Sequence, residues 1–410
     1  MKPRILRVFL PFAFGFFVSY VYRAVNSIIA PDLAADVGVD PSQLGLLTST
    51  YFLAFVTTQL PLGVILDRYG PRRIEAAMLL VAALGALVFS RAQGLGALIL
   101  GRALIGFGVS ACLMGALKAY VLWFPKERLP LINGLQLAAG GFGALVATAP
   151  VQFALGFTDW RGVFLGLAAL TLITAGLVYF VVPEHEREGT PQSLRTQMAA
   201  MRKIYGSLHF WRIAPWVALN QASFLALQGL WAGPWLLDVA GYSRETTSVI
   251  LMLIAVSMVT GYVGIGSIAH RLHRRGIPLV AVCVGGMLAF LGTLLMLMLP
   301  PWGATPILWM LFGFFGTSGA LGYAILAQRV PPEAAGKVNT AQNLLIFVGA
   351  FVAQWGVGAV IAGSPAADGL GYAPVGYRNA MLVLAAFLAL GALWFLVAGL
   401  LLRINKPVDS

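Results

Sequence analysis

The sequence predicts an all-α membrane protein with twelve transmembrane helices in two pseudo-symmetric six-helix bundles. Of the 410 residues, 59% are hydrophobic and only 10% are charged, whereas a soluble protein carries about 25% charged residues. The chain also contains twelve apolar runs of membrane-spanning length, and its two halves repeat several sequence features. This composition excludes a soluble enzyme and an extended water-soluble domain.

The twelve predicted spans are apolar runs separated by turn signals, since a membrane helix needs about 20 apolar residues. They cover residues 8–31, 43–66, 74–90, 95–123, 129–155, 162–182, 211–237, 245–269, 277–299, 303–328, 334–362 and 379–402. The first run follows Lys2, Arg4 and Arg7, as in a signal peptide. However, Arg23 and Asn26 lie late in it and no small-residue cleavage site follows, so we interpret it as the first span.

One long polar segment separates the sixth run from the seventh. It predicts an N-terminal bundle over residues 1–182, a cytoplasmic linker over 183–210 and a C-terminal bundle over 211–410. With the N-terminus placed inside, 20 of the 27 Lys and Arg residues fall in inner segments and four in outer ones. This bias predicts a multi-pass protein of the inner (plasma) membrane with both termini in the cytoplasm. Because the basic residues follow this rule, the net charge of +12 does not indicate a nucleic-acid partner.

The two halves repeat several residues in the same order along the chain. The corresponding positions are Gly63 and Gly266, Asp67 and His270, Arg68 and Arg271, and the dipeptides Trp160-Arg161 and Tyr377-Arg378. Parallel six-helix repeats joined by a loop are typical of a transporter whose site lies between the halves, near the membrane midplane.

Two motifs resemble those of the major facilitator superfamily, and the resemblance extends over essentially the whole chain. They are Gly63-Val-Ile-Leu-Asp67-Arg68-Tyr-Gly70-Pro-Arg72-Arg73, between the second and third runs, and Arg102-Ala-Leu-Ile-Gly106-Phe-Gly108 in the fourth. The first helix, with Tyr20-Val-Tyr-Arg23 followed by Pro31, is similar to that of organophosphate:phosphate antiporters and anion:cation symporters. The resemblance implies two bundles that rock around a central site, with the arginine at position 23 binding the anionic group of the substrate.

The residues expected to control gating and conformation are Gly63, Asp67, Arg68, Gly70, Arg72 and Arg102. Asp67 ends a predicted helix among arginines, where it can join a network that holds the halves together on one side. A solvated turn is the alternative for Arg72 and Arg73 taken alone. Arg102 is expected to act mainly as a structural residue beside the first helix. Since His270 replaces the acid in the second copy, we expect an asymmetric gate.

Arg23 is the main candidate for substrate binding. It lies ~22 Å from the inner end of the first run at ~1.5 Å per residue. Tyr20 and Asn26 fall within about 60° of it around the helix. A guanidinium suits carboxylate or phosphate, and a charge within lipid is costly enough to indicate function. An arginine satisfied by helix carbonyls or a structural partner is the alternative.

Other polar and aromatic residues inside the runs complete the expected site. The expected substrate contacts are Arg23, Tyr20, Asn26, Tyr51, Lys118, Gln228, Trp231 and Asn343. Lys118 lies roughly 9 Å inside the inner end of the fourth run, so it either faces the site or extends toward headgroups. For the amides and aromatics the alternative is packing between helices. All 15 acidic residues are placed at span ends or in loops, Glu75 among the inner ones. Arg23 and Lys118 therefore have no evident counter-ion, and an anionic substrate is expected to supply it.

Together these residues predict a secondary active transporter for a small organic anion. A carboxylate is favoured over a sugar phosphate because the second half has no intramembrane arginine to complete a phosphate clamp. The alternatives are an exporter of amphipathic compounds or drugs without a dedicated anion site, and a non-transporting membrane sensor on the same scaffold. We expect no catalytic residue, metal or cofactor. The expected partners are the substrate, membrane lipid and a coupling proton or counter-anion, and we expect a monomer.

Overall fold

The computed structural model describes residues 5–184, 194–328, 330, 332–365 and 372–404. Within these ranges the regular secondary structure is helical, apart from one isolated bridge between Pro365 and Tyr372. The predicted all-α membrane fold is confirmed. Part of the predicted linker over 183–210 lies outside the described residues.

The helices follow the predicted spans closely. Those of the first half are α2 (Leu10–Ala24), α3 (Asn26–Val37), α4 (Pro41–Tyr69), α5 (Pro71–Ser90), α6 (Leu95–Val109), α7 (Ala111–Trp123), α8 (Leu129–Val146), α9 (Ala149–Ala154) and α10 (Trp160–Val181). After them come α11 (Leu194–Tyr205), α12 (Leu208–Ala226), the π-helical turn η3 (Leu227–Trp231), α13 (Ala232–Asp238), α14 (Arg244–His273), α15 (Leu279–Met296), α16 (Thr305–Gly316), α17 (Leu321–Ala327), α18 (Pro332–Ala362) and α19 (Pro374–Ile404).

Ten described helical segments are long and apolar enough to cross a membrane, and eleven if α2 and α3, bent by 47°, count as one span. Each of them coincides with one of the predicted runs. The remaining run, predicted over 211–237, is formed by α12, η3 and α13. This span is therefore interrupted in its middle by a π-helical turn, a feature that often accompanies function.

Local sequence sets where several helices begin and end. Asp40 caps α4, where its side chain accepts a hydrogen bond from the backbone N–H of Gln43 at 2.8 Å and Gln43 returns one at 3.1 Å. Gly70, with φ of 80°, separates α4 from α5. A side chain would strain the backbone there, so the glycine of the predicted loop motif is required by the turn itself.

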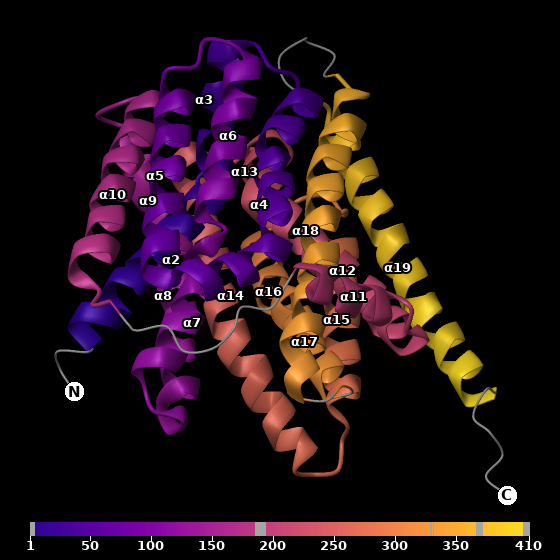
Figure 1. Cartoon of the computed structure of the whole chain (residues 1–410). Helices are drawn as coiled ribbons and strands as arrows, with labels where there is room; N and C mark the ends of the chain where they lie inside the picture. The colour runs from indigo at the N-terminus through magenta and orange to yellow at the C-terminus, as the bar shows by residue number, and fades with distance from the viewer. Residues whose placement is uncertain (1–4, 185–193, 329, 331, 366–371, 405–410) are drawn as a thin grey trace, which may run out of the picture.

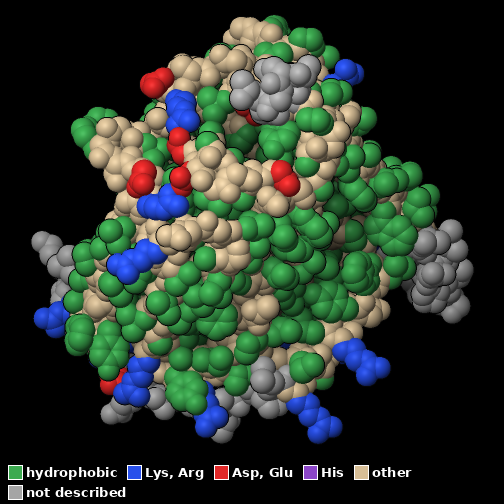
Figure 2. All heavy atoms as spheres, turned by 90° about the horizontal axis from the view of Figure 1, so that it is seen from above, with side chains coloured by type: hydrophobic (Ala, Val, Ile, Leu, Met, Phe, Trp, Pro, Cys, Tyr) green, Lys and Arg blue, Asp and Glu red, His purple; other side chains and the backbone are tan. Residues whose placement is uncertain are grey.

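The helices of each half pack mainly against one another, and the halves meet chiefly along α4 and α18, and along α8 and α14. Figure 1 shows the first half in indigo to magenta beside the second in orange to yellow, with the start of α2 and the end of α19 at the same end of the molecule. Large hydrophobic side chains such as Phe180, 81% exposed, cover wide areas of the surface, as lipid contact requires (Figure 2).

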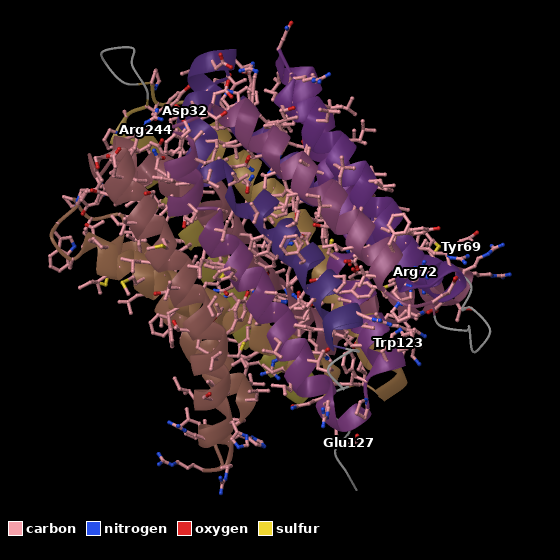
Figure 3. The ribbon with its side chains drawn as sticks, turned by 90° about the vertical axis from the view of Figure 1, so that its left-hand side faces the viewer. Asp32, Tyr69, Arg72, Trp123, Glu127 and Arg244 are labelled. Atoms are coloured by element: carbon pink, nitrogen blue, oxygen red, sulfur yellow. The ribbon has the colours of Figure 1, made fainter. Side chains whose placement is uncertain are left out.

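The two ends of the molecule carry different sets of charged residues. The inner end holds Tyr69, Arg72 and Glu127, and the outer end holds Asp32 and Arg244 (Figure 3). The sequence predicts that the inner end faces the cytoplasm.

The repeated aromatic-arginine dipeptides make matching contacts at the outer end. Trp160 in the first turn of α10 donates a hydrogen bond from Nε1 to Asp36 at 3.2 Å. Tyr377 in the first turn of α19 donates one from its hydroxyl to Asp238. In each half, therefore, the aromatic residue ties the sixth span of that half to the end of its first.

Candidate substrate-binding site

Arg23 lies near the end of α2, just before the first span bends. Its side chain is buried, at 8% exposure, and its Nε has no hydrogen-bond partner among the described residues. The guanidinium carbon lies 4.6 Å from the ring centroid of Tyr20 and 5.4 Å from that of Phe347. Because Phe347 belongs to α18, Arg23 is at the boundary between the two halves.

In the described part of the chain, four aromatic rings lie around this guanidinium. Tyr51 and Phe55 of α4 each place a ring centroid 5.9 Å from it, and the rings of Phe55 and Phe347 are 4.5 Å apart. Cation–π contacts are worth about 0.5–2 kcal/mol each, less than the several kcal/mol that burying an ion costs. In the part of the chain that the structure describes, no carboxylate lies within ion-pair distance of Arg23. Its charge is thus only partly compensated by the protein.

Two tyrosines that the sequence analysis did not single out face Arg23 from the second half. Tyr262 of α14 and Tyr323 of α17 both interact electrostatically with Arg23. The Tyr323 hydroxyl donates to Oδ1 of Asn343, which brings this predicted contact to the same region. The sequence did not predict Tyr262 and Tyr323 as site residues because the chain has 12 tyrosines. A single tyrosine inside an apolar run can equally be an aromatic residue at the membrane interface.

Tyr51 lies between two arginines. Its ring centroid is 5.9 Å from the guanidinium carbon of Arg23 and 5.4 Å from that of Arg102, and its hydroxyl donates to the backbone oxygen of Ser19 at 3.4 Å. Arg102 is buried beside α2, where its Nη1 donates to the backbone oxygen of Tyr22 at 3.2 Å. Arg102 thus holds the first span on the side away from the second half.

Asn26 and Gln228 are buried close to the same segment of backbone. Asn26 opens α3 directly after the bend, and its Oδ1 has no hydrogen-bond partner among the described residues. Gln228 lies in η3, and a Cβ on its neighbour Gly229 would be 3.6 Å from the backbone oxygen of Arg23. The π-helical turn therefore passes beside the part of α2 that carries Arg23.

Trp231 makes contacts outside this region. Its Nε1 donates to the backbone oxygen of Gln354 at 2.9 Å. A Cβ at Gly45 would be 3.3 Å from its ring, and one at Gly358 would be 2.9 Å away. Trp231 thus packs where α4 and α18 approach each other, nearer the outer end than Phe347.

The outer end is closed by close contacts between the halves, which we call the outer seal. It consists of Gly45, Thr48, Gly233, Gln354 and Gly358, with the ion pair of Asp32 and Arg244. A Cβ at Gly45 would be 2.8 Å from the backbone oxygen of Gln354. A Cβ at Gly233 would lie even closer to the backbone oxygen of Ser27, and one at Gly358 even closer to that of Pro41.

Two polar contacts cross the outer seal. Gln354 donates from Nε2 to Thr48 Oγ1 at 2.7 Å, and Arg244 pairs with Asp32 at 2.6 Å. Figure 3 shows Asp32 and Arg244 together at this end. The sequence analysis missed the seal because glycines are frequent in the chain, at 47, and their partners lie in the other half.

A pocket of about 210 Å³ lies at the inner end. It is lined by Gln59, Leu62, Gly63, Leu66, Asp67, Met114, Lys118 and Thr340. Since Thr340 belongs to α18 and the other residues to α4 and α7, the two halves separate here. The halves also leave a larger open hollow, of about 690 Å³, at the outer end, where Asp36 and Arg161 of the first half and Glu245 of the second line it beside the Asp32–Arg244 pair. Close packing in the outer seal lies beside this hollow, so both ends of the molecule are indented.

Lys118 has a counter-ion, contrary to the expectation from the sequence. It forms an ion pair with Asp67, and both side chains are partly exposed, at 29% and 37%. Asp67 lies at the end of α4 and Lys118 near the end of α7, so this pair lies within the first half and does not join the halves in this conformation. Among the contacts of the described residues, none places Lys118 beside Arg23.

The other residues of the predicted loop motif contact neighbours at the inner end. Arg72 donates from Nε to the backbone oxygen of Tyr179 at 2.7 Å and lies 3.7 Å from Glu184, with which Arg73 also pairs. Arg68 lies over the ring of Tyr69 at 5.4 Å. A Cβ at Gly63 would be 3.1 Å from the side chain of Gln197 in α11. Their role in gating stays a prediction.

Glu75 lies near the inner end of its span, as expected from the sequence, but it is buried and not a surface charge. Its side chain is 0% exposed inside α5, and neither carboxyl oxygen has a hydrogen-bond partner among the described residues. The sequence did not reveal this because Glu75 is only four residues from Pro71, where α5 begins, and its burial depends on helices that are distant in sequence.

Comparison with known proteins fits this architecture. The chain is 26% identical over 276 residues to the nitrate/nitrite transporter NrtP of Picosynechococcus sp., a match that covers 60% of this chain and 49% of that protein. It is 23% identical over 383 residues to the probable galactarate/D-glucarate transporter GudP of Escherichia coli, covering 84% of each. Its fold matches a bacterial homolog of the human lysosomal transporter Spinster with a TM-score of 0.81, over 100% of both chains at 17% identity.

The chain also matches a family as a whole. Residues 12–354 match the Major Facilitator Superfamily. The chain belongs to the Major Facilitator Superfamily.

Proposed function

We propose that this protein is a transporter that moves a small organic anion across the membrane by alternating access, with Arg23 binding the anionic group. The observation that carries the proposal is the guanidinium of Arg23, buried at the boundary of the halves without a carboxylate partner. A buried cation without a counter-ion is destabilised until an anion compensates it. The planar fork of the guanidinium fits a carboxylate.

The names of two relatives support a negatively charged substrate. GudP is named for galactarate and D-glucarate, which are dicarboxylates, and NrtP for nitrate and nitrite. All of these compounds are anions. A carboxylate fits better than a sugar phosphate, because among the described residues the other cations of the spans are already engaged, Arg102 with Tyr22 and Lys118 with Asp67.

Nitrate is the second candidate substrate. The four ring centroids within 6 Å of the Arg23 guanidinium make its surroundings compact and largely apolar. A small planar anion suits such surroundings, and the Tyr20 hydroxyl can donate a hydrogen bond to it. An exporter of amphipathic compounds without an anion site remains the alternative that makes no use of Arg23.

The arrangement of the two ends supports a transport cycle. In the outer seal the halves are in close contact around α4 and α18, and hollows between the halves lie beside the seal and at the inner end. Rocking of the halves would open the seal and expose Arg23 to the outer side. The positive-inside bias supports a cytoplasmic inner end in a plasma membrane.

The test is a thermal-shift titration of purified protein with D-glucarate, D-glucuronate, nitrate, phosphate and an organic cation. Arg23→Gln and Arg23→Lys are compared with Arg275→Gln, a control at an exposed arginine in the turn after α14. A ligand at 100 times its Kd stabilises by about 2.7 kcal/mol. We expect this stabilisation from carboxylates in the wild type and the control, its loss in Arg23→Gln, and partial retention in Arg23→Lys.

The other possible results of this titration distinguish between the alternative functions. Equal stabilisation of wild type and Arg23→Gln by carboxylates refutes the role of Arg23. Stabilisation by nitrate alone supports the second candidate, and stabilisation by the cation alone supports an exporter without an anion site. Saturable uptake of the stabilising compound into proteoliposomes excludes a non-transporting sensor.

A further inference from the structure

Glu75 is a fully buried acid that the proposed substrate site does not use. It is 0% exposed, and both carboxyl oxygens lack a hydrogen-bond partner among the described residues. It lies four residues after the start of α5, ~6 Å from the inner end of that helix at ~1.5 Å per residue. An ionised carboxylate in such surroundings would be strongly destabilised.

The carboxyl of Glu75 occupies a space that two glycines create. A Cβ on Gly15 of α2 would lie 2.6 Å from Oε1, and a Cβ on Gly115 of α7 would lie 2.5 Å from Oε2. Any other residue at either position would collide with the acid. The side chain is therefore held between the first span and the fourth, instead of extending to the headgroups as a surface glutamate would.

The charged and titratable groups around Glu75 include one cation that could reach it. On α7, Cys112 and Tyr120 interact electrostatically with Glu75, and Lys118 follows Gly115 by three residues. Residues three apart are neighbours on a helix surface. On α5 itself, Arg72 and Arg73 are held by Tyr179 and Glu184.

The remaining helices packed on this region bring no further cation to it. Near Gly15, α2 carries only the tyrosines at positions 20 and 22, and Arg23 is ~12 Å away along the helix. The π-helical turn η1 (Ile5–Phe9), which packs against α2 and α7, carries Arg7, an exposed side chain eight residues before Gly15. The other charged or titratable residues of α4, α6 and α10 are Tyr51, Asp67, Arg68, Tyr69, Arg102, Arg161 and Tyr179.

Lys118 connects this buried acid to the inner pocket. It lines that pocket together with Met114 and Asp67, while Gly115, on the same turn of α7, faces Glu75. The lysine is 29% exposed and pairs with Asp67. Its long stem can redirect the ammonium group around α7 without movement of the helix.

We propose that Glu75 is a proton-binding site reached from the inner end, and that Lys118 exchanges between Asp67 and Glu75 according to whether the proton is bound. With the proton on Glu75, the acid is neutral and Lys118 pairs with Asp67, as in this structure. When the proton leaves to water in the inner pocket, the carboxylate attracts Lys118 and the pair with Asp67 breaks. Protonation of Glu75 thereby controls whether Lys118 pairs with Asp67, which belongs to the loop that is expected to act as a gate. The inference depends on the transporter fold and not on the identity of the substrate.

The first test asks whether Glu75 carries a proton. Infrared spectroscopy of purified, substrate-free protein in water and in D₂O reports the C=O band of a protonated carboxyl. At neutral pH we expect this band in the wild type and in Glu127→Gln, a control at an exposed acid of the inner end. We expect Glu75→Gln to lack it. An unchanged band in Glu75→Gln would overturn the proposal.

The second test asks whether Lys118 responds to the ionisation of Glu75. Thermal stability is measured from acidic to alkaline pH for wild type, Glu75→Gln, Lys118→Gln and the double variant, with Lys203→Gln as an exposed lysine control. At alkaline pH we expect Lys118→Gln to lose more stability than the wild type, since nothing then neutralises Glu75. We expect this extra loss to vanish when Glu75→Gln is combined with it.

The double variant keeps the second test decisive even if single variants are weakly stable. A non-additive effect of the two substitutions that grows with pH supports the exchange. If Lys118→Gln has the same effect in both backgrounds at every pH, Lys118 does not reach Glu75 and the exchange is wrong. Loss of anion binding in the earlier titration would refute the proposed substrate and leave both of these results valid.

Discussion

Replacing Gly45 by alanine should open the outer seal without unfolding the protein. A Cβ at this position would lie 2.8 Å from the backbone oxygen of Gln354, so α4 and α18 must separate by about 0.6 Å to restore ordinary contact at 3.4 Å. Overpacking of this kind costs about 1–3 kcal/mol. The gain in helix propensity, about 1 kcal/mol, applies to both open and closed states because α4 is helical in each, so it cancels. The closed state should therefore lose about 5- to 150-fold in population relative to the open one.

The assay is a distance measurement between spin labels at the outer end. Labels at Ala35 on α3 and Thr246 on α14 are exposed on opposite halves, and both native cysteines are buried and free. We expect Gly45→Ala to add a longer distance that is minor in the wild type. Gly292→Ala in α15 is the matched control, because its Cβ would meet nothing within 4 Å. If Gly45→Ala and Gly292→Ala give the same distances as the wild type, the contacts at Gly45 do not hold the outer end closed.

Three further substitutions separate site residues from structural ones. Trp231→Phe removes the hydrogen bond to the α18 backbone and should lower the free energy of unfolding by about 0.5–1.5 kcal/mol. Anion affinity in thermal-shift titrations should be unchanged, and a weaker affinity would show that Trp231 contacts the substrate. Tyr22→Phe removes the 2.9 Å hydrogen bond to Thr171 and should lower the free energy of unfolding by about 1 kcal/mol. The affinity for anions should again be unchanged, because Tyr20 and not Tyr22 borders the proposed site; a weaker affinity would place Tyr22 in it. Asp67→Asn breaks the partly exposed pair with Lys118 and should cost about 1 kcal/mol or less in stability, but slow uptake into proteoliposomes more than tenfold; normal uptake would contradict a gating role.

The spans and Arg23 could be predicted because lipid imposes severe constraints. A helix must be apolar over about 20 residues to cross a bilayer, and a charge within such a run costs enough to stand out. The position of Arg23 late in the first run therefore indicated a buried guanidinium, and the structure places it 8% exposed between the halves. The bend after it and the π-helical turn in η3 were not predicted, because hydropathy does not report backbone hydrogen bonding.

Contacts between distant helices could not be read from the sequence in the same way. Lys118 and Asp67 are 51 residues apart, and nothing in the periodicity of either span indicates that α7 presents one to the other. The burial of Glu75 depends on Gly15 and Gly115, whose small size matters only because both approach the same side chain. In each case the missing information was which faces of α2, α5 and α7 meet.

The outer seal is weak enough for a substrate to influence it. Its polar part is one buried hydrogen bond, worth about 0.5–1.5 kcal/mol, and the partly exposed pair of Asp32 and Arg244, worth about 0–1 kcal/mol. Its glycine contacts give close packing, but in lipid such packing gains no hydrophobic free energy. Burial of the Arg23 charge without a counter-ion involves a comparable or larger free energy. An anion that binds Arg23 more tightly in one conformation can therefore shift the balance between closed and open states, which is the condition for transport driven by substrate binding.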